Sequence, residues 1–374
     1  MPFVKSLDVL SEIKHIHAMC RFLGLAPYTI TKIHFSGRVT INYNIRNNFW
    51  TSVLSLITAF VLFIGNMMSF IYDTHLARHS VSYSINLYIC IPLVFTVASV
   101  GILTNLTVNK NKMAEFLAKI SYIDIKLNKL TRPVIFSHWR CKTYLDNSDI
   151  LVFIFVVLPY YVFDAWIWNS DIRMTFLIYS IRYGQVLDMA LMLHYCKCVG
   201  IIHKRLSVLN KYTLQIQPSH FVIHHLRNLF GEICEVVDIL NSMYGPVLLL
   251  ELIKVCLVLV NLIPFLRLLE ISLLKAVSLI FWKIMAISEL IYIVVTCQTT
   301  IFKLQKLIQS IHRVCYLRHT LSVDAFQQLT FYFEQISTCD LKFTVCGLFK
   351  LDYSFLCSVL GSLVTYTIIL FQFK

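Results

Sequence analysis

Long runs of apolar side chains alternate with polar stretches along the whole of this sequence. A helix rises about 1.5 Å per residue, so about 20 apolar residues cross the ~30 Å hydrocarbon core of a bilayer. Runs of that length predict spanning helices at 49–71, 84–106, 150–168, 174–199, 245–266, 276–301 and 353–373. The pattern therefore predicts an all-α membrane protein with seven transmembrane helices. The apolar share of 57% and the mean hydropathy of +0.70 agree with that class.

The basic residues lie mainly in the connections between these runs, and they alternate in number. One set of connections holds 24 Lys and Arg residues, and the other set holds four. The rich set comprises 1–48, 107–149, 200–244 and 302–352, and the poor set comprises 72–83, 169–173 and 267–275. Because positive connections stay in the cytoplasm, the N-terminus is predicted inside and the C-terminus outside. This topology explains the formal charge of +13, and no nucleic-acid partner is predicted.

The long inner connections have the pattern of helices and not of flexible linkers. Phe326, Leu329, Phe333 and Ile336 recur at helical spacing, and Pro218 separates two expected extensions. We therefore expect helices that continue below the membrane and pack together there. The predicted parts are a cytoplasmic N-terminal segment (1–48), a six-helix bundle with inner extensions (49–301), an inner segment (302–352) and a seventh helix (353–374).

The last apolar run carries its polar residues on one stripe. Tyr353 to Phe373 holds no charge, and the spacing gathers the polar positions on one face of a helix. These positions are Ser354, Ser358, Ser362, Thr365 and Gln372. One interpretation is that the stripe lines a wet path between copies of the chain. The alternative is that small polar residues serve as ordinary contacts between membrane helices.

Ionisable and aromatic residues inside the other runs predict a pocket that opens outward. Such residues are costly in lipid and tend to face an interior cavity. The candidates are Asn86, Tyr160, Asp164, Trp168, Tyr179, Arg182, Tyr183, Trp282 and Glu289. Together they offer aromatic walls and a few hydrogen-bonding groups for a small molecule. The alternative is that the aromatic residues belong to the interfacial belt, while Asp164 and Arg182 merely pair with each other.

The remaining polar residues do not predict catalysis. No nucleophile motif or phosphate-binding glycine loop is present, so the chain is predicted not to be an enzyme and to need no cofactor. His220 and His224 are spaced like metal ligands, but no third ligand is evident and no metal site is predicted. Glu251 and Lys254 are expected to form an internal ion pair or an intersubunit contact.

The end of the chain resembles a known family. Thr365-Tyr366, five mostly apolar residues and Gln372-Phe373 resemble the C-terminal signature of the insect gustatory receptors, and the run Gly347 to Asp352 resembles what precedes it. Thr367 departs from the pattern, because it is polar and is not the Glu that is typical of the sweet-sugar subgroup. The resemblance implies a receptor that acts as a ligand-gated cation channel in the plasma membrane of sensory neurons.

The resemblance also implies an arrangement and a set of partners. Four copies, as a homotetramer or a heterotetramer with other gustatory receptors, would meet through a cytoplasmic anchor domain and place their seventh helices around a pore. Gln372, Phe373 and Ile369 would constrict the outer end, Thr365 and Tyr366 would set helix packing, and Asp352 would attract cations at the inner mouth. A small-molecule tastant would open the pore to sodium, potassium and calcium ions within membrane lipid.

Three further interpretations stay open at this point. Bitter or other plant compounds are the expected tastants, and a fructose-type sugar receptor is the alternative within the family. An olfactory receptor subunit of the same superfamily shares the inverted topology but lacks the full Thr-Tyr…Gln-Phe ending. A G-protein-coupled receptor also has seven helices, but its N-terminus lies outside the cell.

Overall fold

The computed structural model describes residues 8–26, 28–32, 39–42, 49–76, 91–107, 109–131, 148–168, 172–215, 220–260, 273–317, 323–339 and 341–372, and the statements below concern these residues. The elements before the third predicted span are α1 Val9–Phe22, β1 Thr29–Lys32, β2 Val39–Asn42, α2 Phe49–Leu76, α4 Ile91–Leu106 and α5 Asn109–Thr131. The elements after them are α6 Ser148–Val152, η3 Phe153–Val157, α7 Leu158–Trp168, α8 Ile172–Gln215, α9 His220–Val260, α11 Leu273–Leu317, α12 Val323–Thr338, β3 Thr344–Val345, β4 Phe349–Lys350 and α13 Tyr353–Gln372.

The helices form a membrane bundle of the predicted class. Among the described residues, four helical stretches are long and apolar enough to cross a membrane, at 150–167, 178–214, 221–259 and 273–314. Shorter apolar helices cover Val53–Gly65, Pro92–Asn105 and Tyr353–Tyr366. Each of the seven overlaps one of the seven predicted spans, so the prediction of fold class is confirmed. The third span is one continuous helix in which η3 forms a π-helical turn just before Pro159.

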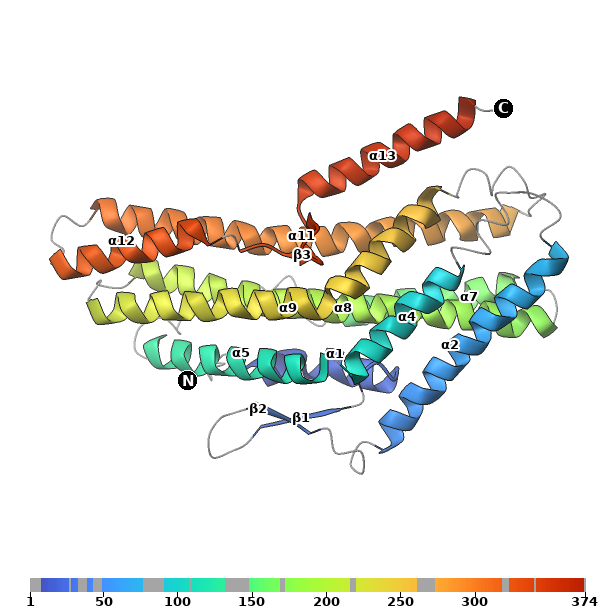
Figure 1. Ribbon diagram of the computed structural model, residues 1–374, viewed down its shortest axis with the longest axis horizontal. Helices are drawn as coiled ribbons and strands as arrows, with labels where there is room; N and C mark the ends of the chain where they lie inside the picture. The colour runs from blue at the N-terminus through green and yellow to red at the C-terminus, as the bar shows by residue number, and fades with distance from the viewer. Residues whose placement is uncertain are drawn as a thin grey trace.

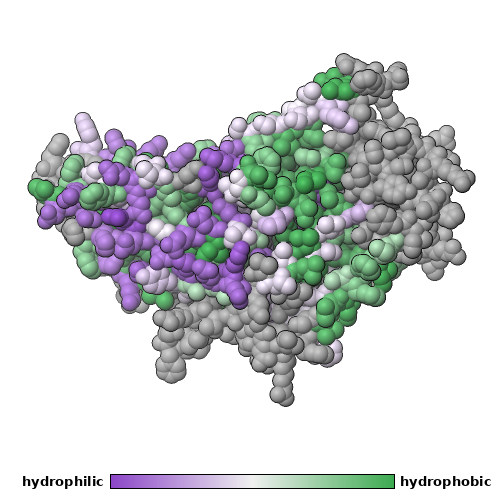
Figure 2. Space-filling model, in the orientation of Figure 1, coloured by the Kyte–Doolittle hydropathy of each residue, from purple (hydrophilic) through white to green (hydrophobic). Residues whose placement is uncertain are grey.

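Three long helices, α8, α9 and α11, run along most of the length of an elongated molecule (Figure 1). Helix α8 has 44 residues and would be about 66 Å long, more than twice the hydrocarbon thickness of a bilayer. Figure 2 shows the consequence, since hydrophilic residues gather on one half of the visible face and hydrophobic residues on the other. The expected helical extensions of α8, α9 and α11 therefore exist and pack with α1, α5 and α12 in the hydrophilic half.

Helix α9 changes direction along its length (Figure 1). Pro246 lies inside α9, where proline removes a backbone hydrogen bond and bends a helix. Its neighbour Gly245 lies against the β3–β4 hairpin, because a Cβ on Gly245 would come within 3.1 Å of the Cys346 amide nitrogen. The bend in α9 therefore lies where the chain turns back toward α13.

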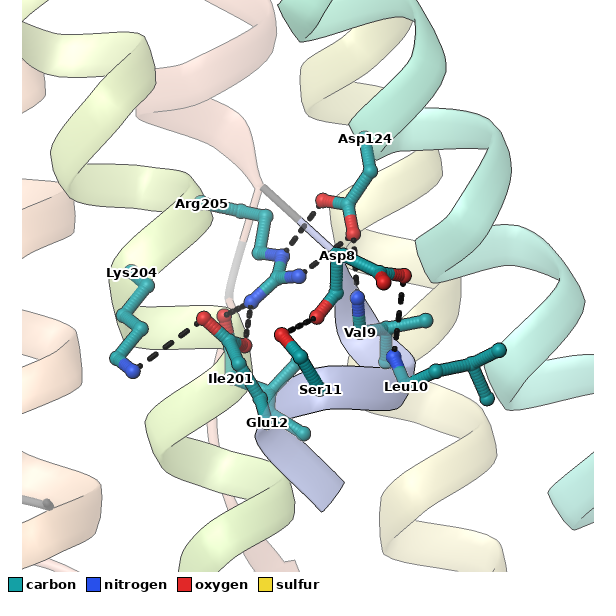
Figure 3. Close-up of polar contacts among 9 residues, drawn as sticks. All are labelled: Asp8, Val9, Leu10, Ser11, Glu12, Asp124, Ile201, Lys204 and Arg205. Atoms are coloured by element: carbon teal, nitrogen blue, oxygen red, sulfur yellow. Dashed lines mark hydrogen bonds and ion pairs between the residues drawn. The ribbon is translucent and has the colours of Figure 1, made fainter. Parts of the chain in front are cut away.

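Helix α1 packs across α5 and α8 through a buried charged cluster (Figure 3). Arg205 of α8 donates to both carboxylate oxygens of Asp124, at 2.9 and 2.6 Å, and also binds Glu12 of α1. Asp124 Oδ2 accepts a further hydrogen bond from the Val9 amide at 3.1 Å. Lys204 pairs with the second Glu12 oxygen at 3.3 Å. The cluster joins three helices that are far apart in the sequence.

Electrostatics in this cluster favour the charged arginine. Arg205 is fully buried, with 0% of its surface exposed. Burial opposes its charge, but the carboxylates of Asp124 and Glu12 raise the pKa of Arg205 above its ordinary value. Burial also raises the pKa of Asp124, and the guanidinium charge works against that shift. Asp124 and Glu12 both accept from the guanidinium, which opposes the effect of burial on the charged groups.

The last helix stands apart from the bundle (Figure 1). Phe355, Leu356 and Val359, in its first two turns, contact the core. Beyond them, Val364, Tyr366, Ile368 and Ile369 are exposed. A single chain therefore leaves most of α13 without a protein neighbour among the described residues.

Candidate functional site

A polar cluster joins α7, α8 and α11 within the segments that are predicted to span the membrane. Asp164 of α7 is completely buried and forms an ion pair with Arg182 of α8. Ser278 of α11 donates its hydroxyl to the same carboxylate, and the Tyr160 hydroxyl donates to the Ser278 carbonyl at 2.9 Å. Tyr160 and Asp164 thus lie on one face of α7, as their spacing predicts. The ion pair between Asp164 and Arg182, which was the alternative to a ligand-binding role for these residues, is present.

Arg182 also orients two residues beside this cluster. Its Nη1 donates to Gln185 Oε1 at 2.9 Å, and its guanidinium carbon lies 5.5 Å from the centre of the Trp282 ring. The Lys283 ammonium lies 4.3 Å from the same ring centre. Lys283 also donates to the Val258 carbonyl of α9. Trp282 is therefore a partly buried residue that lies beside two cations.

A small cavity, here called the five-helix cavity, lies next to these residues. Its volume is about 20 Å³. Five helices, α4, α7, α8, α9 and α11, supply its lining of Val94, Tyr161, Gln185, Lys254, Val255, Val258, Trp282, Ala286 and Glu289. Apolar side chains with a few polar groups are typical of small-molecule sites. The cavity lies between the segments of these five helices that are predicted to span the membrane.

Lys254 links the cavity to a second charged cluster. Its ammonium pairs with Asp188 of α8 at 3.0 Å and with Glu251 of its own helix at 2.7 Å. The expected contact between Glu251 and Lys254 is therefore an internal ion pair. Glu289 of α11 also faces this cluster, but its Oε1 has no hydrogen-bond partner among the described residues.

A second small cavity, here called the α9–α11 cavity, reaches the base of α13. It is bordered by Glu251 and Leu252 of α9, Glu289 and Ile293 of α11, and Leu351 just before α13. Glu289 lines both cavities. One carboxylate therefore stands between the five-helix cavity and the segment that enters the last helix.

The structure does not bring all the predicted pocket residues together. Tyr183 lies one residue from Arg182 but points elsewhere, since its hydroxyl lies 3.2 Å from Thr58 Oγ1 and approaches the Leu23 carbonyl. Tyr179 is 43% exposed. Tyr183 points away from Arg182 because adjacent residues on a helix point about 100° apart. Asn86 lies outside the described residues, and the Trp168 side chain is not among those described.

Residues missed by the sequence interpretation complete the five-helix cavity. Tyr161, Gln185 and Lys254 line it, while Tyr160 lies in the neighbouring cluster. Lys254 could have been identified from the sequence as a cavity residue, because it is an ionisable residue inside an apolar run. Gln185 had only a weak signal, and Tyr161 could not be separated from Tyr160 without knowing how α7 is rotated.

The start of α13 is fixed by a hairpin and a cap. Strands β3 and β4 pair antiparallel, with Val345 opposite Phe349, and the turn between them has φ of 51° at Cys346 and 71° at Gly347. Asp352 Oδ1 then accepts a hydrogen bond from the Phe355 amide at 2.8 Å, which caps the helix. Asp352, predicted at the inner mouth, therefore also has a structural role.

The polar stripe of α13 is exposed along the described part of the helix. The Ser358, Ser362 and Thr365 hydroxyls donate to the carbonyls of Ser354, Ser358 and Gly361, at 2.8–2.9 Å. Because these hydroxyls are satisfied within the helix, they can face either lipid or another helix without an unpaired donor. The helix ends at Gln372, whose side chain is not described, and Phe373 lies outside the described residues.

A groove runs beside α13 with a volume of about 740 Å³. Ser354, Ser358, Ser362 and Tyr366 of α13 line it together with Cys256 of α9 and the hairpin residues Leu348, Phe349 and Lys350. The groove is therefore bordered by both the polar stripe and the connection that positions the helix.

Comparison with known proteins identifies the class to which this arrangement belongs. The sequence profile described as "7tm Chemosensory receptor" matches residues 13–374. The chain therefore belongs to this chemosensory receptor family, which comprises insect odorant and gustatory receptors. Its members are receptor ion channels, so the prediction that the chain is not an enzyme is confirmed. No curated protein sequence matches the chain.

Two solved structures share the fold. The insect olfactory receptor OR5 from Machilis hrabei matches with a TM-score of 0.66 and 14% identity, covering 97% of this chain and 98% of that chain. The same receptor in complex with eugenol matches with a TM-score of 0.67 and 15% identity over the same shares. The similarity shows that the chain shares the fold of that receptor over 97% of its length.

Proposed function

We propose that this chain is a gustatory receptor that acts as a tastant-gated, non-selective cation channel. The single observation that carries the proposal is α13, a 20-residue apolar helix with a polar stripe that stands largely exposed in one chain. Four such helices around an axis would cover one another and line a path for sodium, potassium and calcium ions. Residues 353–374 are then the pore segment, and 302–352 belong to the anchor.

The hydrophilic half supports assembly into a tetramer, either of identical chains or with related receptors. Helix α12 exposes Val323, Phe326 and Phe331, with 52% of Phe326 accessible. This helix lies in the half beyond the lipid, where exposed apolar side chains favour burial against another protein. The groove beside α13 supports the same conclusion, because it has room for side chains of a neighbouring helix.

The five-helix cavity is the proposed site of the tastant. It lies among the predicted second to sixth spanning helices and includes Trp282 and Glu289 from the predicted set. Tyr160, Asp164 and Arg182 hold the neighbouring wall. A bound molecule opens the channel only if it binds the open arrangement more tightly than the closed one. Bitter or other plant compounds are the proposed ligands, and a sugar remains the alternative.

An olfactory receptor subunit is the second candidate. The observation in its favour is the similarity of fold to an insect olfactory receptor over the whole chain. The observation against it is the complete Thr365-Tyr366…Gln372-Phe373 ending. Under either function, the channel would work in the plasma membrane of sensory neurons.

The gate provides the first test. In the proposed channel, Gln372, Phe373 and Ile369 narrow the outer end of the pore at rest, so Gln372→Ala or Phe373→Ala should raise the current without ligand. The measurement is whole-cell current and calcium entry in cells expressing the chain, with and without a panel of plant compounds and sugars. Ser288→Ala, on the exposed face of α11, is the control. Unchanged resting current and gating in both variants would remove these residues from the gate.

A further inference from the structure

Two residues that line the five-helix cavity each have a buried polar atom with unused hydrogen-bonding capacity. Gln185 Nε2 and Glu289 Oε1 have no hydrogen-bond partner among the described residues. Their side chains are nevertheless buried, with exposed fractions of 4% for Gln185 and 9% for Glu289. Buried polar atoms without partners are uncommon and costly, so each calls for a matching group in the cavity.

The donor and the acceptor can be assigned from chemistry. Arg182 Nη1 lies 2.9 Å from the Gln185 amide oxygen, and a guanidinium can only donate. The oxygen of Gln185 must therefore face Arg182, which leaves its NH₂ group for the cavity. Glu289 presents a carboxyl oxygen as the acceptor. Among the described residues of the lining, Gln185 and Glu289 thus offer one unpaired donor and one unpaired acceptor.

The charges around the cavity disfavour a charged ligand. An ammonium group would meet Lys254 in the lining, with Arg182 and Lys283 beside the Trp282 wall. A carboxylate would meet Glu289, with Asp188 and Glu251 paired to Lys254 directly behind the lining. Because like charges repel strongly in a medium of low dielectric constant, a neutral polar group fits better than either ion.

We propose that this cavity recognises the hydroxyl group of an uncharged alcohol or phenol. The ligand hydroxyl donates to Glu289 Oε1, and its oxygen accepts from Gln185 Nε2. One hydroxyl satisfies both, because it is a donor and an acceptor at the same atom. Tyr161, Trp282 and Val258 supply apolar surface for the hydrocarbon part of the ligand. This assignment rests on the proposed function and adds the chemical class of the ligand.

The size of the cavity connects recognition with opening. A volume of about 20 Å³ holds roughly one water-sized group, so the hydroxyl fits but its hydrocarbon body requires the walls to separate. Two of those walls, α9 and α11, also border the α9–α11 cavity against Leu351 at the base of α13. Binding of the whole ligand would therefore favour an arrangement in which the support of α13 has changed.

Matched pairs of compounds test the assignment. Cells expressing the full chain are exposed to eugenol and its O-methyl ether, 4-ethylphenol and 4-ethylanisole, and 1-hexanol and its methyl ether, with calcium entry as the readout. The ether keeps the oxygen acceptor but loses the donor. We expect each hydroxyl compound to be about 10- to 100-fold more potent than its ether, the usual cost of leaving one buried polar group without its hydrogen-bond partner.

Variants then separate the roles of the two residues. Glu289→Leu should reduce the preference for the hydroxyl compound to within about threefold, whereas Glu289→Gln keeps an oxygen acceptor and should retain most of it. Gln185→Leu should weaken alcohol and ether alike, because both keep the oxygen that accepts from Gln185 Nε2. Ser288→Ala, adjacent to Glu289 but exposed, should leave the preference unchanged. An epitope tag read at the cell surface confirms that each variant is present.

The outcomes separate this inference from the proposed function. Ethers as potent as their alcohols in the unmodified chain, or a preference that survives Glu289→Leu, would overturn the assignment. Currents evoked only by compounds without a hydroxyl group would also overturn it while supporting a ligand-gated channel. A chain that reaches the surface but passes no current with any compound would contradict the proposed function, and this inference would fall with it.

Discussion

At the scale of single residues, the effect of an ion pair on stability depends on how deeply the pair is buried. Arg205 lies fully buried between Asp124 and Glu12, whereas Lys119 and Glu235 form a pair at the surface of the hydrophilic half. A buried charge that loses its partner remains in a medium of low dielectric constant, while an exposed charge regains water. The two pairs therefore offer a matched comparison within one molecule.

Removing the buried partner should destabilise the protein strongly. Asp124→Asn leaves Arg205 without one of its two carboxylates, and we expect a loss of about 3–5 kcal/mol in the free energy of unfolding. Lys119→Met breaks the exposed pair and should cost less than about 1 kcal/mol. Thermal unfolding of the purified receptor in detergent measures both. Equal shifts in the two variants would show that the cluster in Figure 3 does not hold α1 in place.

A buried histidine predicts how stability depends on pH. Burial lowers the pKa of His17 from 6.5 to about 4, and its Nε2 lies 3.1 Å from the Tyr28 carbonyl. The unfolded chain binds this proton more tightly than the folded chain does. The contribution of His17 to the free energy of unfolding is therefore fully present above pH 6.5 and is lost as the pH is lowered toward 4. Between pH 7 and pH 5 the loss from this group should be about 2 kcal/mol.

The unfolding temperature at several pH values tests that dependence. His17→Gln removes this titration, so its unfolding temperature should fall less between pH 7 and pH 5. Part of the dependence should remain, because burial also lowers the pKa of His203 to about 4. If His17→Gln shows the same pH profile as the original chain, His17 does not titrate as described.

At the scale of elements, the sequence predicted the spanning helices but not the parts that hold them together. Spans and extensions follow from apolar length and helical spacing, and both are confirmed. Helices α1 and α5 were hidden in connections that were interpreted by charge alone, although α1 carries a clear apolar stripe of Val9, Ile13 and Ile16. The β1–β2 hairpin has only four residues per strand, which is too short for a distinct alternation.

The site was predicted only in part for a related reason. Ionisable residues in apolar runs are visible in a sequence, and Asp164, Arg182 and Glu289 were found in that way. Which of two adjacent residues faces a cavity depends on the rotation of the helix, and this separates Tyr161 from Tyr160 and Arg182 from Tyr183. Such rotation is set by contacts between distant segments, which have no local signal.

The start of α13 allows its structural and electrical roles to be separated. Asp352→Asn keeps an oxygen that can cap the helix at Phe355 but removes the charge, whereas Asp352→Ala removes both. We expect Asp352→Ala to destabilise the helix start by about 1 kcal/mol. If the carboxylate concentrates cations, Asp352→Asn should lower single-channel conductance while the cap remains.

Salt concentration provides the control for that measurement. The screening length is about 30 Å at ~0.01 M salt and about 3 Å at ~1 M. The difference in conductance between the original chain and Asp352→Asn should therefore be largest in dilute salt and nearly vanish in concentrated salt. Equal conductance and cation selectivity at both concentrations would leave Asp352 with its capping role alone.

At the scale of the whole molecule, orientation connects the charge pattern with the pore. The four connections rich in Lys and Arg all belong to the side that is predicted to be cytoplasmic, and the hydrophilic half of Figure 2 gathers the helices of that side. Helix α13 starts near the middle of the molecule and runs toward the end opposite α12 (Figure 1). In this orientation the C-terminal end of α13, which precedes the proposed gate residues, would face the extracellular side.

Epitope tags on intact cells test this orientation. A tag after Lys374 should be labelled by an impermeant antibody without permeabilisation, because α13 carries the C-terminus through the membrane to the outside. A tag inserted between α11 and α12, at 318–322, should be labelled only after permeabilisation, since four positive connections hold that side in the cytoplasm. Labelling of the C-terminal tag only in permeabilised cells would place Gln372 and Phe373 inside. An outer gate formed by the last helix would then be impossible.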